Sequence, residues 1–456
     1  MRRVVKVSRI RIIITIIVVV LTTLLTGCTG KEPNEIAYVV ALGIDSTDDD
    51  NYKITIQYAN TTQISGGASE SGGKAGSEIV DNVTIEAPNI YAGVGLANNI
   101  VSKSFSMSHA KLIVFSKEIA EKGVKDMIET LVRSEEIRPD VFIAVANTTA
   151  NDYLTSVNPE MEVNPAQYYQ LIYQKNQLVG IPDGQLREFF TGLYTDNYDS
   201  ILPVAGVIEG AGGNSQNDDK GQSKDGQNEG SEGSSESLDS FESKSSDDKD
   251  ENEKEKDAEK NTSKYEYDIK NYVGGETAIE KKNKAEAIGA AVFEKDKMVG
   301  ELGEVETEIC KILKGDYTYS YLTYYNNDTP DIPITVKTTQ QKKPKYKIDT
   351  DKKTVDIELY IESDLYSLPA DYNVENKIED FERDVANYTS STCTKFINNF
   401  TKKYNSDILK LNEKVKYKFL TNNQYNWFKK NVGWSEYKFS VCTNFKVRRT
   451  GLIVRE

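Results

Sequence analysis

The sequence is 456 residues long, enough for about two to four domains, and carries a formal net charge of −15. That charge argues against nucleic acid as a partner, because neutralising phosphates requires a basic surface. The four cysteines are far apart, and none forms a Cys-x-x-Cys pair, so neither a disulfide framework nor a cysteine zinc site is expected. Cys310, Cys393 and Cys442 are interpreted as small apolar side chains, although one Cys393–Cys442 bond stays compatible with the sequence.

The N-terminus has the layout of a secretory signal. Basic residues from Arg2 to Arg11 precede an apolar run of about 14 residues that ends at Leu25. This run is shorter than the roughly 20 residues of a transmembrane helix. The tetrapeptide 25–28 (LTGC) resembles the lipobox of bacterial lipoproteins, which implies cleavage before Cys28 and a diacylglycerol on its thiol. We therefore predict a signal peptide at 1–27 and a lipid-anchored tether at 28–34; the alternative is an uncleaved N-terminal anchor.

In the first ordered block, apolar residues recur with two different spacings. Residues 52–58 place apolar side chains at every second position, which predicts a strand with one buried face. Residues 89–103 place them at every third or fourth position, which predicts a helix. Together with short apolar runs of buried-strand type, this alternation predicts an N-terminal α/β domain with a mixed sheet at 35–150. Those further strands are expected at 36–44, 111–115 and 141–145.

The composition changes after a more helical segment at 151–213, which ends in an edge-like strand at 201–204. Residues 214–262 contain sixteen acidic and seven basic side chains, so this insert contributes −9 of the net charge. It has almost nothing apolar to bury and is predicted to be disordered. An acidic interaction tail or a cation-binding segment is the less favoured interpretation, because no Asp-x-Asp-x-Asp-Gly spacing occurs.

Ordered patterns resume after the insert. The segment 263–315 is predicted as a middle hairpin region, and 316–456 as a C-terminal α+β domain. Its longest helical signal covers 373–404, and 437–447 alternate strictly between apolar and polar residues. We expect helices packed on an antiparallel sheet. The predicted fold class is therefore mixed α/β and α+β, with about three consecutive domains behind the signal peptide.

The sequence shows no catalytic constellation. The single histidine, His109, would have to serve any Ser/His/Asp or Cys/His site, and it is interpreted as a turn or strand-end residue. Glu301, Glu304 and Glu306 have the chemistry for glycoside cleavage, but a charged turn face explains them more simply. No nucleophile elbow, phosphate-binding loop or His-Glu-x-x-His motif occurs. We predict a protein that is not an enzyme, without a catalytic residue, metal or cofactor; ligand-binding residues are not identifiable from the sequence.

Several short motifs are spread over almost the whole chain outside the acidic insert. They are 25–28 (LTGC), 31–36 (KEPNEI), 41–45 (ALGID), 109–115 (HAKLIVF), 120–123 (AEKG), 136–138 (EIR), 288–300 (IGAAVFEKDKMVG), 403–408 (KYNSDI) and 447–451 (VRRTG). In this order they resemble the Ger(x)C family of spore germination lipoproteins, the C subunits of nutrient germinant receptors. One departure is Thr29-Gly30 after the lipobox cysteine, where family members often carry Trp-Asp.

The resemblance implies a fold of three consecutive α/β domains and a non-enzymatic role in receptor assembly and germination signalling. It implies a lipid-anchored protein on the outer face of the spore inner membrane, bound to two multi-pass subunits, A and B. A small nutrient would act through the complex. The alternative is a solute-binding lipoprotein that captures a nutrient for a transporter. Such a protein would have a deep cleft between two similar lobes, and the dissimilar halves of this chain favour the receptor subunit.

Overall fold

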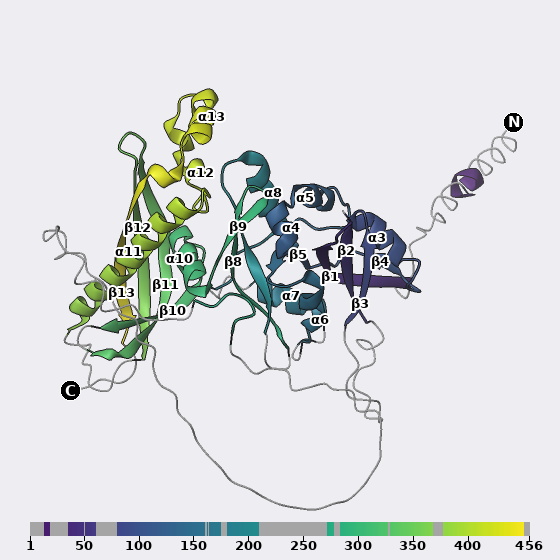
Figure 1. Ribbon diagram of the computed structural model, residues 1–456, viewed down its shortest axis with the longest axis horizontal. Helices are drawn as coiled ribbons and strands as arrows, with labels where there is room; N and C mark the ends of the chain where they lie inside the picture. The colour runs from purple at the N-terminus through teal and green to yellow at the C-terminus, as the bar shows by residue number, and fades with distance from the viewer. Residues whose placement is uncertain are drawn as a thin grey trace, which may run out of the picture.

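The computed structural model describes the folded body of the chain and a short helix within the predicted signal peptide (Figure 1). Cys28 and the acidic insert lie outside the described residues. None of the helices within the described ranges is both long enough and apolar enough to cross a bilayer. The described residues are 13–18, 35–49, 51–60, 80–159, 162, 164–174, 180–208, 271–277, 283–326, 329–367 and 377–450.

Nine strands form one mixed sheet in the order β3-β2-β1-β5-β6-β7-β8-β9, with β4 paired to β1 (Figure 1). The central strands β1, β5, β6 and β7 pair in parallel, and antiparallel strands complete both ends. The predicted mixed sheet is confirmed. The strands are β1 (Ile36–Ser46), β2 (Tyr52–Ala59), β3 (Val80–Ala87), β4 (Ser104–Ser106), β5 (Leu112–Ser116), β6 (Phe142–Ala146), β7 (Ile201–Val207), β8 (Ala285–Glu294) and β9 (Lys297–Leu302).

Helices cover both faces of this sheet, which explains why its central strands are continuous apolar runs. In β5, Ile113 and Phe115 pack into one buried cluster, and Leu112 and Val114 pack into another on the opposite face. The first cluster includes side chains of α3, α4, α5 and α8, and the second those of α6 and α7. The helices are α3 (Ile90–Ala97), α4 (Lys117–Lys122), α5 (Lys125–Val132), α6 (Ala150–Ser156), α7 (Pro165–Tyr173) and α8 (Leu186–Thr195).

The C-terminal part contains a second sheet in the order β10-β11-β12-β13, with the long helix α11 packed on β13 (Figure 1). The strict alternation of buried and exposed residues predicted for the last strand is confirmed in β13. The elements are α10 (Glu304–Lys314), β10 (Tyr319–Asn326), β11 (Thr329–Asp349), β12 (Thr354–Ser367), α11 (Ile378–Lys403), α12 (Leu411–Val415), η3 (Lys416–Lys418), α13 (Asn422–Asn431), η4 (Trp434–Glu436) and β13 (Lys438–Arg449).

Two expectations about the strands were wrong. The last sheet is not purely antiparallel, because β13 pairs in parallel with β12. A parallel pair needs a crossover connection, and α11, α12 and α13 supply it. The strand containing Pro203 is not an edge, because β7 lies between β6 and β8. The ladder with β8 is irregular after Pro203, which accommodates a residue that has no N–H to donate.

The middle hairpin belongs to the first sheet, since β8 pairs with β7. One buried cluster nevertheless joins the two sheets: it includes Ala290, Val292 and Leu302 from the hairpin together with residues of α10, α11 and β12. The fold class predicted from the sequence, mixed α/β and α+β with several domains, is confirmed. The division at residues 150, 213, 262 and 315 stays a prediction.

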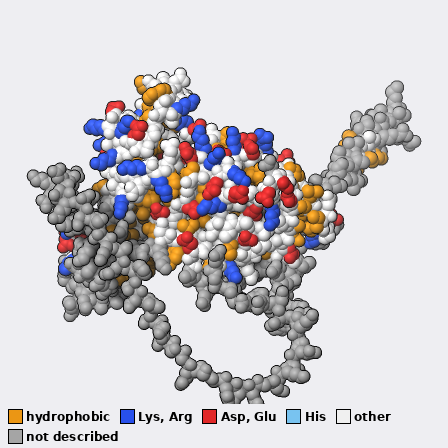
Figure 2. Space-filling view, in the orientation of Figure 1, with side chains coloured by type: hydrophobic (Ala, Val, Ile, Leu, Met, Phe, Trp, Pro, Cys, Tyr) orange, Lys and Arg blue, Asp and Glu red, His pale blue; other side chains and the backbone are white. Residues whose placement is uncertain are grey.

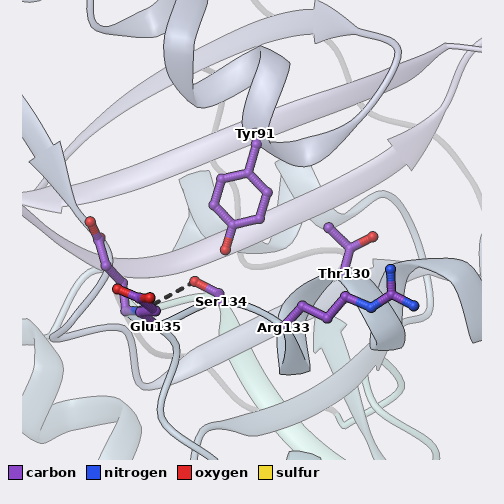
Figure 3. Close-up of a pocket in the computed structure, with 6 residues that line it drawn as sticks. Tyr91, Thr130, Arg133, Ser134 and Glu135 are labelled. Carbon is purple, nitrogen blue, oxygen red and sulfur yellow. Dashed lines mark hydrogen bonds between the residues drawn. The ribbon is translucent and has the colours of Figure 1, made fainter.

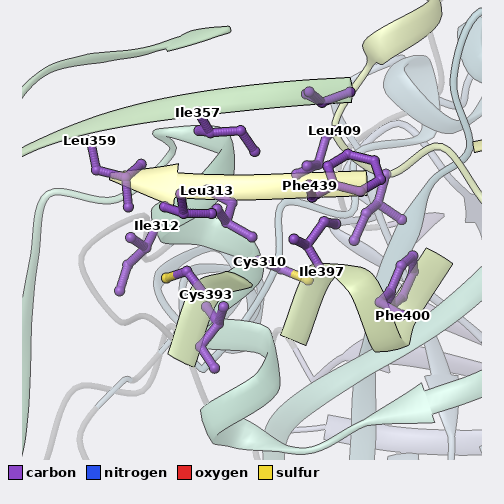
Figure 4. Close-up of a cluster of buried hydrophobic side chains, with 14 of the residues drawn as sticks. Cys310, Ile312, Leu313, Ile357, Leu359, Cys393, Ile397, Phe400, Leu409 and Phe439 are labelled. Atoms are coloured by element: carbon purple, nitrogen blue, oxygen red, sulfur yellow. The ribbon is translucent and has the colours of Figure 1, made fainter. Parts of the chain in front are cut away.

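The three cysteines of the folded body are unpaired and lie in two different environments. Cys310 of α10 and Cys393 of α11 are buried among aliphatic side chains (Figure 4), whereas Cys442 of β13 is exposed. The bond between Cys393 and Cys442 that the sequence left open is therefore absent. Burial raises the pKa of the Cys393 thiol to about 12 and also raises the pKa of Cys310.

We expect a thiol reagent to modify Cys442 rapidly in the native protein and to reach Cys310 and Cys393 only after unfolding. The reason is that the thiolate is the nucleophile, and burial suppresses both its formation and its access. Counting reactive thiols in a Cys28→Ala chain, before and after denaturant, measures this. Cys442→Ser is the matched control and is expected to show no fast reaction. More than one fast thiol in the native Cys28→Ala chain would contradict the packing.

Candidate functional site

Three of the four residues considered for catalysis, His109, Glu301 and Glu306, have local structural partners. His109 is exposed, and its ring meets that of Tyr38 edge-on with centroids 5.0 Å apart. The carboxylate of Glu301 forms an ion pair with Lys117 at 3.0 Å. Glu306 accepts the backbone N–H of Gly303 at 3.2 Å at the start of α10. In the described part of the chain, no three potential metal-ligating side chains come together.

A polar surface depression of about 480 Å³ lies where α3 meets the end of α5 (Figure 3). Its polar groups are held by the surrounding chain. Arg133 pairs with Glu129 at 3.2 Å, and the Ser134 hydroxyl accepts the N–H of Glu136 at 3.2 Å. Burial raises the pKa of the Tyr91 hydroxyl. Ser134 and Glu136 shape the loop after α5, and both lie close enough to the Tyr91 hydroxyl to influence its pKa. The lining residues are Tyr91, Thr130, Arg133, Ser134, Glu135 and Glu136.

The motif residues at 403–408 form a more elaborate site, where the end of α11 meets the first sheet. The carboxylate of Asp407 accepts the N–H groups of Leu411 and Asn412, both at 2.8 Å. The N–H of Asp407 donates to the carboxylate of Asp199 at 2.8 Å. The other oxygen of Asp199 accepts the N–H of Lys295 in the β8–β9 turn at 2.9 Å. The Asp199 carboxylate thus connects three segments that are far apart in the sequence, and the Asp407 carboxylate holds the turn that leads into α12.

Close packing beside these carboxylates brings two motifs together. A Cβ atom at Gly300 of β9 would lie 2.3 Å from the ring of Tyr404, so only glycine allows this approach. The Ser406 hydroxyl donates to the carbonyl of Phe293 in β8 at 2.9 Å. Motif 288–300 and motif 403–408 are therefore contact partners. We call this site the Asp407 joint and define it as Asp199, Gly300, Tyr404, Ser406 and Asp407.

The Asp407 joint is electrostatically unusual. Burial raises the pKa of Asp407 from its ordinary 3.8 to about 7; the N–H groups of Asn412 and Leu411 oppose this rise, and the charge of Asp199 adds to it. Burial also raises the pKa of Asp199. Nearby, the ammonium of Lys410 pairs with Glu188 of α8 at 3.0 Å. A buried carboxylate used in this way positions backbone, because both its oxygens are occupied by N–H groups.

A second motif has a comparable positioning role. The carboxylate of Asp45, at the end of motif 41–45, accepts the N–H of Ala150 at 2.6 Å and that of Asn151 at 3.0 Å. It thereby caps the start of α6. A Cβ atom at Gly43 would lie 3.0 Å from a methyl group of Leu154 on the same helix. Motif 41–45 therefore docks α6 on β1.

Sequence reasoning identified the 403–408 motif but missed Asp199. This residue lies in an irregular segment between α8 and β7, where no periodic pattern marks it. Its partner Asp407 is 208 positions away. Only an alignment of relatives or the tertiary structure would have paired the two. Cys28, the predicted lipidation site, lies outside the described residues.

Comparison with known proteins shows which family this chain resembles over the segments that contain these motifs. A family model described as "Spore germination protein N-terminal domain" matches residues 30–207. A second one, "Spore germination B3/ GerAC like, C-terminal", matches residues 288–451. The chain belongs to the Ger(x)C family. The two matches occur in order, and the acidic insert at 214–262 falls in the interval between them.

Individual Ger(x)C relatives are distant. Spore germination protein KC of Bacillus subtilis (strain 168) is 26% identical over 174 residues, covering 35% of this chain and 42% of that protein. Spore germination protein B3 of the same organism is 26% identical over 148 residues, covering 30% of this chain and 36% of that protein. The matched segments thus span less than half of these relatives. A crystal structure of the GerBC protein aligns with 89% of this chain and 96% of its own, at 15% identity and a TM-score of 0.47.

Proposed function

We propose that this chain is a non-catalytic lipoprotein subunit of a nutrient-sensing germinant receptor, needed for receptor assembly and for signalling germination. The observation that carries the proposal is the ordered match of two Ger(x)C family models over residues 30–207 and 288–451. The Asp407 joint supports it. It uses motif residues to fix the C-terminal sheet against the first one, as a subunit that presents fixed surfaces to partners requires.

The proposed location is the outer face of the spore inner membrane, with the chain held by a diacylglycerol on Cys28. The proposed partners are the multi-pass A and B subunits of the receptor, and a small nutrient acts through the complex. The basis is the LTGC tetrapeptide at 25–28 after a basic and apolar leader, together with family membership.

Co-purification from dormant-spore membranes tests the proposal. The chain, tagged at its C-terminus, is expected to elute in detergent with two multi-pass proteins in comparable amounts. A parallel preparation from spores with the untagged chain identifies non-specific binders. Elution of the chain alone, with a nutrient bound at roughly micromolar affinity, would contradict the proposal and support a solute-binding lipoprotein.

A further inference from the structure

The segment after α11 projects from the body of the protein. Figure 1 shows α13 at one extremity of the molecule, beyond α12, and its base contacts the segment after α8, where the Tyr425 hydroxyl donates to the side chain of Asn197 at 2.9 Å. Its inner side is well packed: the Phe428 ring lies 5.0 Å from that of Phe419 and 5.9 Å from that of Trp434. We call residues 411–431 the α12–α13 tip. Because the aromatic side chains inside the α12–α13 tip already pack against one another, its exposed apolar side chains are not needed for folding.

Three such side chains are conspicuous in the α12–α13 tip. Tyr417 is 92% exposed, Leu420 is 95% exposed and Trp427 is 63% exposed. They are three of the four most exposed large hydrophobic side chains among the described residues. Single exposed apolar residues are ordinary, but a Trp, a Tyr and a Leu together on one projection are typical of an interaction surface.

The charge of the α12–α13 tip is opposite to that of the whole chain. Residues 411–431 contain five lysines and one acidic residue, Glu413, whereas the chain carries −15. Lys416 and Lys430 are exposed, and the ion pairs recorded within the described part of the chain do not involve them. Two others are anchored: Lys418 donates to the carbonyl of Ile348, and Lys429 donates to that of Thr195 at 3.0 Å. Figure 2 shows hydrophobic and basic side chains together at this extremity.

We propose that the α12–α13 tip docks on an anionic phospholipid surface. Tyr417, Leu420 and Trp427 enter the boundary between headgroups and acyl chains, and Lys416 and Lys430 contact headgroup phosphates. Aromatic rings with a polar edge favour this boundary, and each lysine near an anionic bilayer adds electrostatic attraction. The inference rests on the proposed membrane location. A lipid on Cys28 would keep the tip near a bilayer at high effective concentration, so that weak contacts suffice.

The test uses the mature chain, residues 28–456, carrying Cys28→Ala so that no lipid is attached. Vesicles of equal parts phosphatidylglycerol and phosphatidylcholine are compared with pure phosphatidylcholine vesicles by co-sedimentation. Binding is expected only to the anionic vesicles and is expected to weaken as salt is raised. The chain has two tryptophans, and Trp434 is buried, so a blue shift of fluorescence on binding reports Trp427.

Two sets of variants locate the contact. Leu420→Ser with Trp427→Ser is expected to weaken vesicle binding roughly tenfold or more, and Lys416→Glu with Lys430→Glu to remove the preference for anionic lipid. The matched control is Leu96→Ser with Ile100→Ser, which changes two exposed apolar side chains on and beside α3 and is expected to bind normally. All these side chains are exposed, so the thermal midpoint should stay unchanged in every variant.

Three outcomes would overturn the proposal: no binding to anionic vesicles, binding that survives both tip variants, or loss of binding in the control. Binding of an acidic polypeptide in place of vesicles, without the blue shift, would overturn it in favour of a protein partner. Because the chain tested carries no lipid, these outcomes are independent of acylation at Cys28 and of co-purification with A and B subunits. Failure here is therefore distinguishable from failure of the proposed function.

Discussion

Asp407→Ala is expected to lower the free energy of unfolding by about 2–4 kcal/mol and to loosen the turn that leads from α11 into α12. The substitution leaves the buried N–H groups of Leu411 and Asn412 without an acceptor, and each such loss costs about 1–3 kcal/mol. Hydrogen exchange at these two amides, together with denaturant unfolding, measures the effect. Faster exchange confined to the α12 region is the expected signature, whereas the Lys295 amide of the β8–β9 turn, which donates to Asp199, should keep its protection.

Asp407→Asn is the matched control, because an amide oxygen keeps one acceptor but does not ionise. In the wild type, the folded-state pKa of Asp407 is raised from 3.8 to about 7, so the folded protein holds this proton more tightly than the unfolded chain. The resulting stability is fully present below about pH 4 and is lost as the pH rises through about 7. The difference in unfolding free energy between wild type and Asp407→Asn should therefore change across this window. A pH-independent difference would contradict the raised pKa.

Cys28→Ala is expected to abolish acylation and to release the protein from the membrane fraction. A thioether-linked lipid needs the thiol, and the chain has no described helix that would span the bilayer in its place. Incorporation of labelled fatty acid and partition between detergent and aqueous phases measure the two effects. Cys442→Ser, which removes the exposed cysteine of β13, should leave both unchanged. If the Cys28→Ala protein stays equally membrane-bound, the N-terminus is an uncleaved anchor.

Local sequence patterns were sufficient to predict the helices and strands whose burial follows a regular pattern along the chain. The apolar run of β5 identified that strand because a strand buried on both faces carries apolar residues at every position. The alternation in β13 identified this strand because a period of two reports which face is buried. The helical spacing of α11 was legible for the same reason, although the helix begins at Ile378, later than expected. The short motifs, taken in their order along the chain, were sufficient to predict the family.

Only the tertiary structure decided how these elements are joined. The parallel direction of β13, the internal place of β7 and the pairing of the middle hairpin with the first sheet depend on contacts between distant segments. The same holds for Asp199 and Asp407, which meet across 208 positions. Periodicity reports a residue's neighbours within about four positions, whereas strand partners and buried carboxylate contacts are selected by the packing of the whole chain.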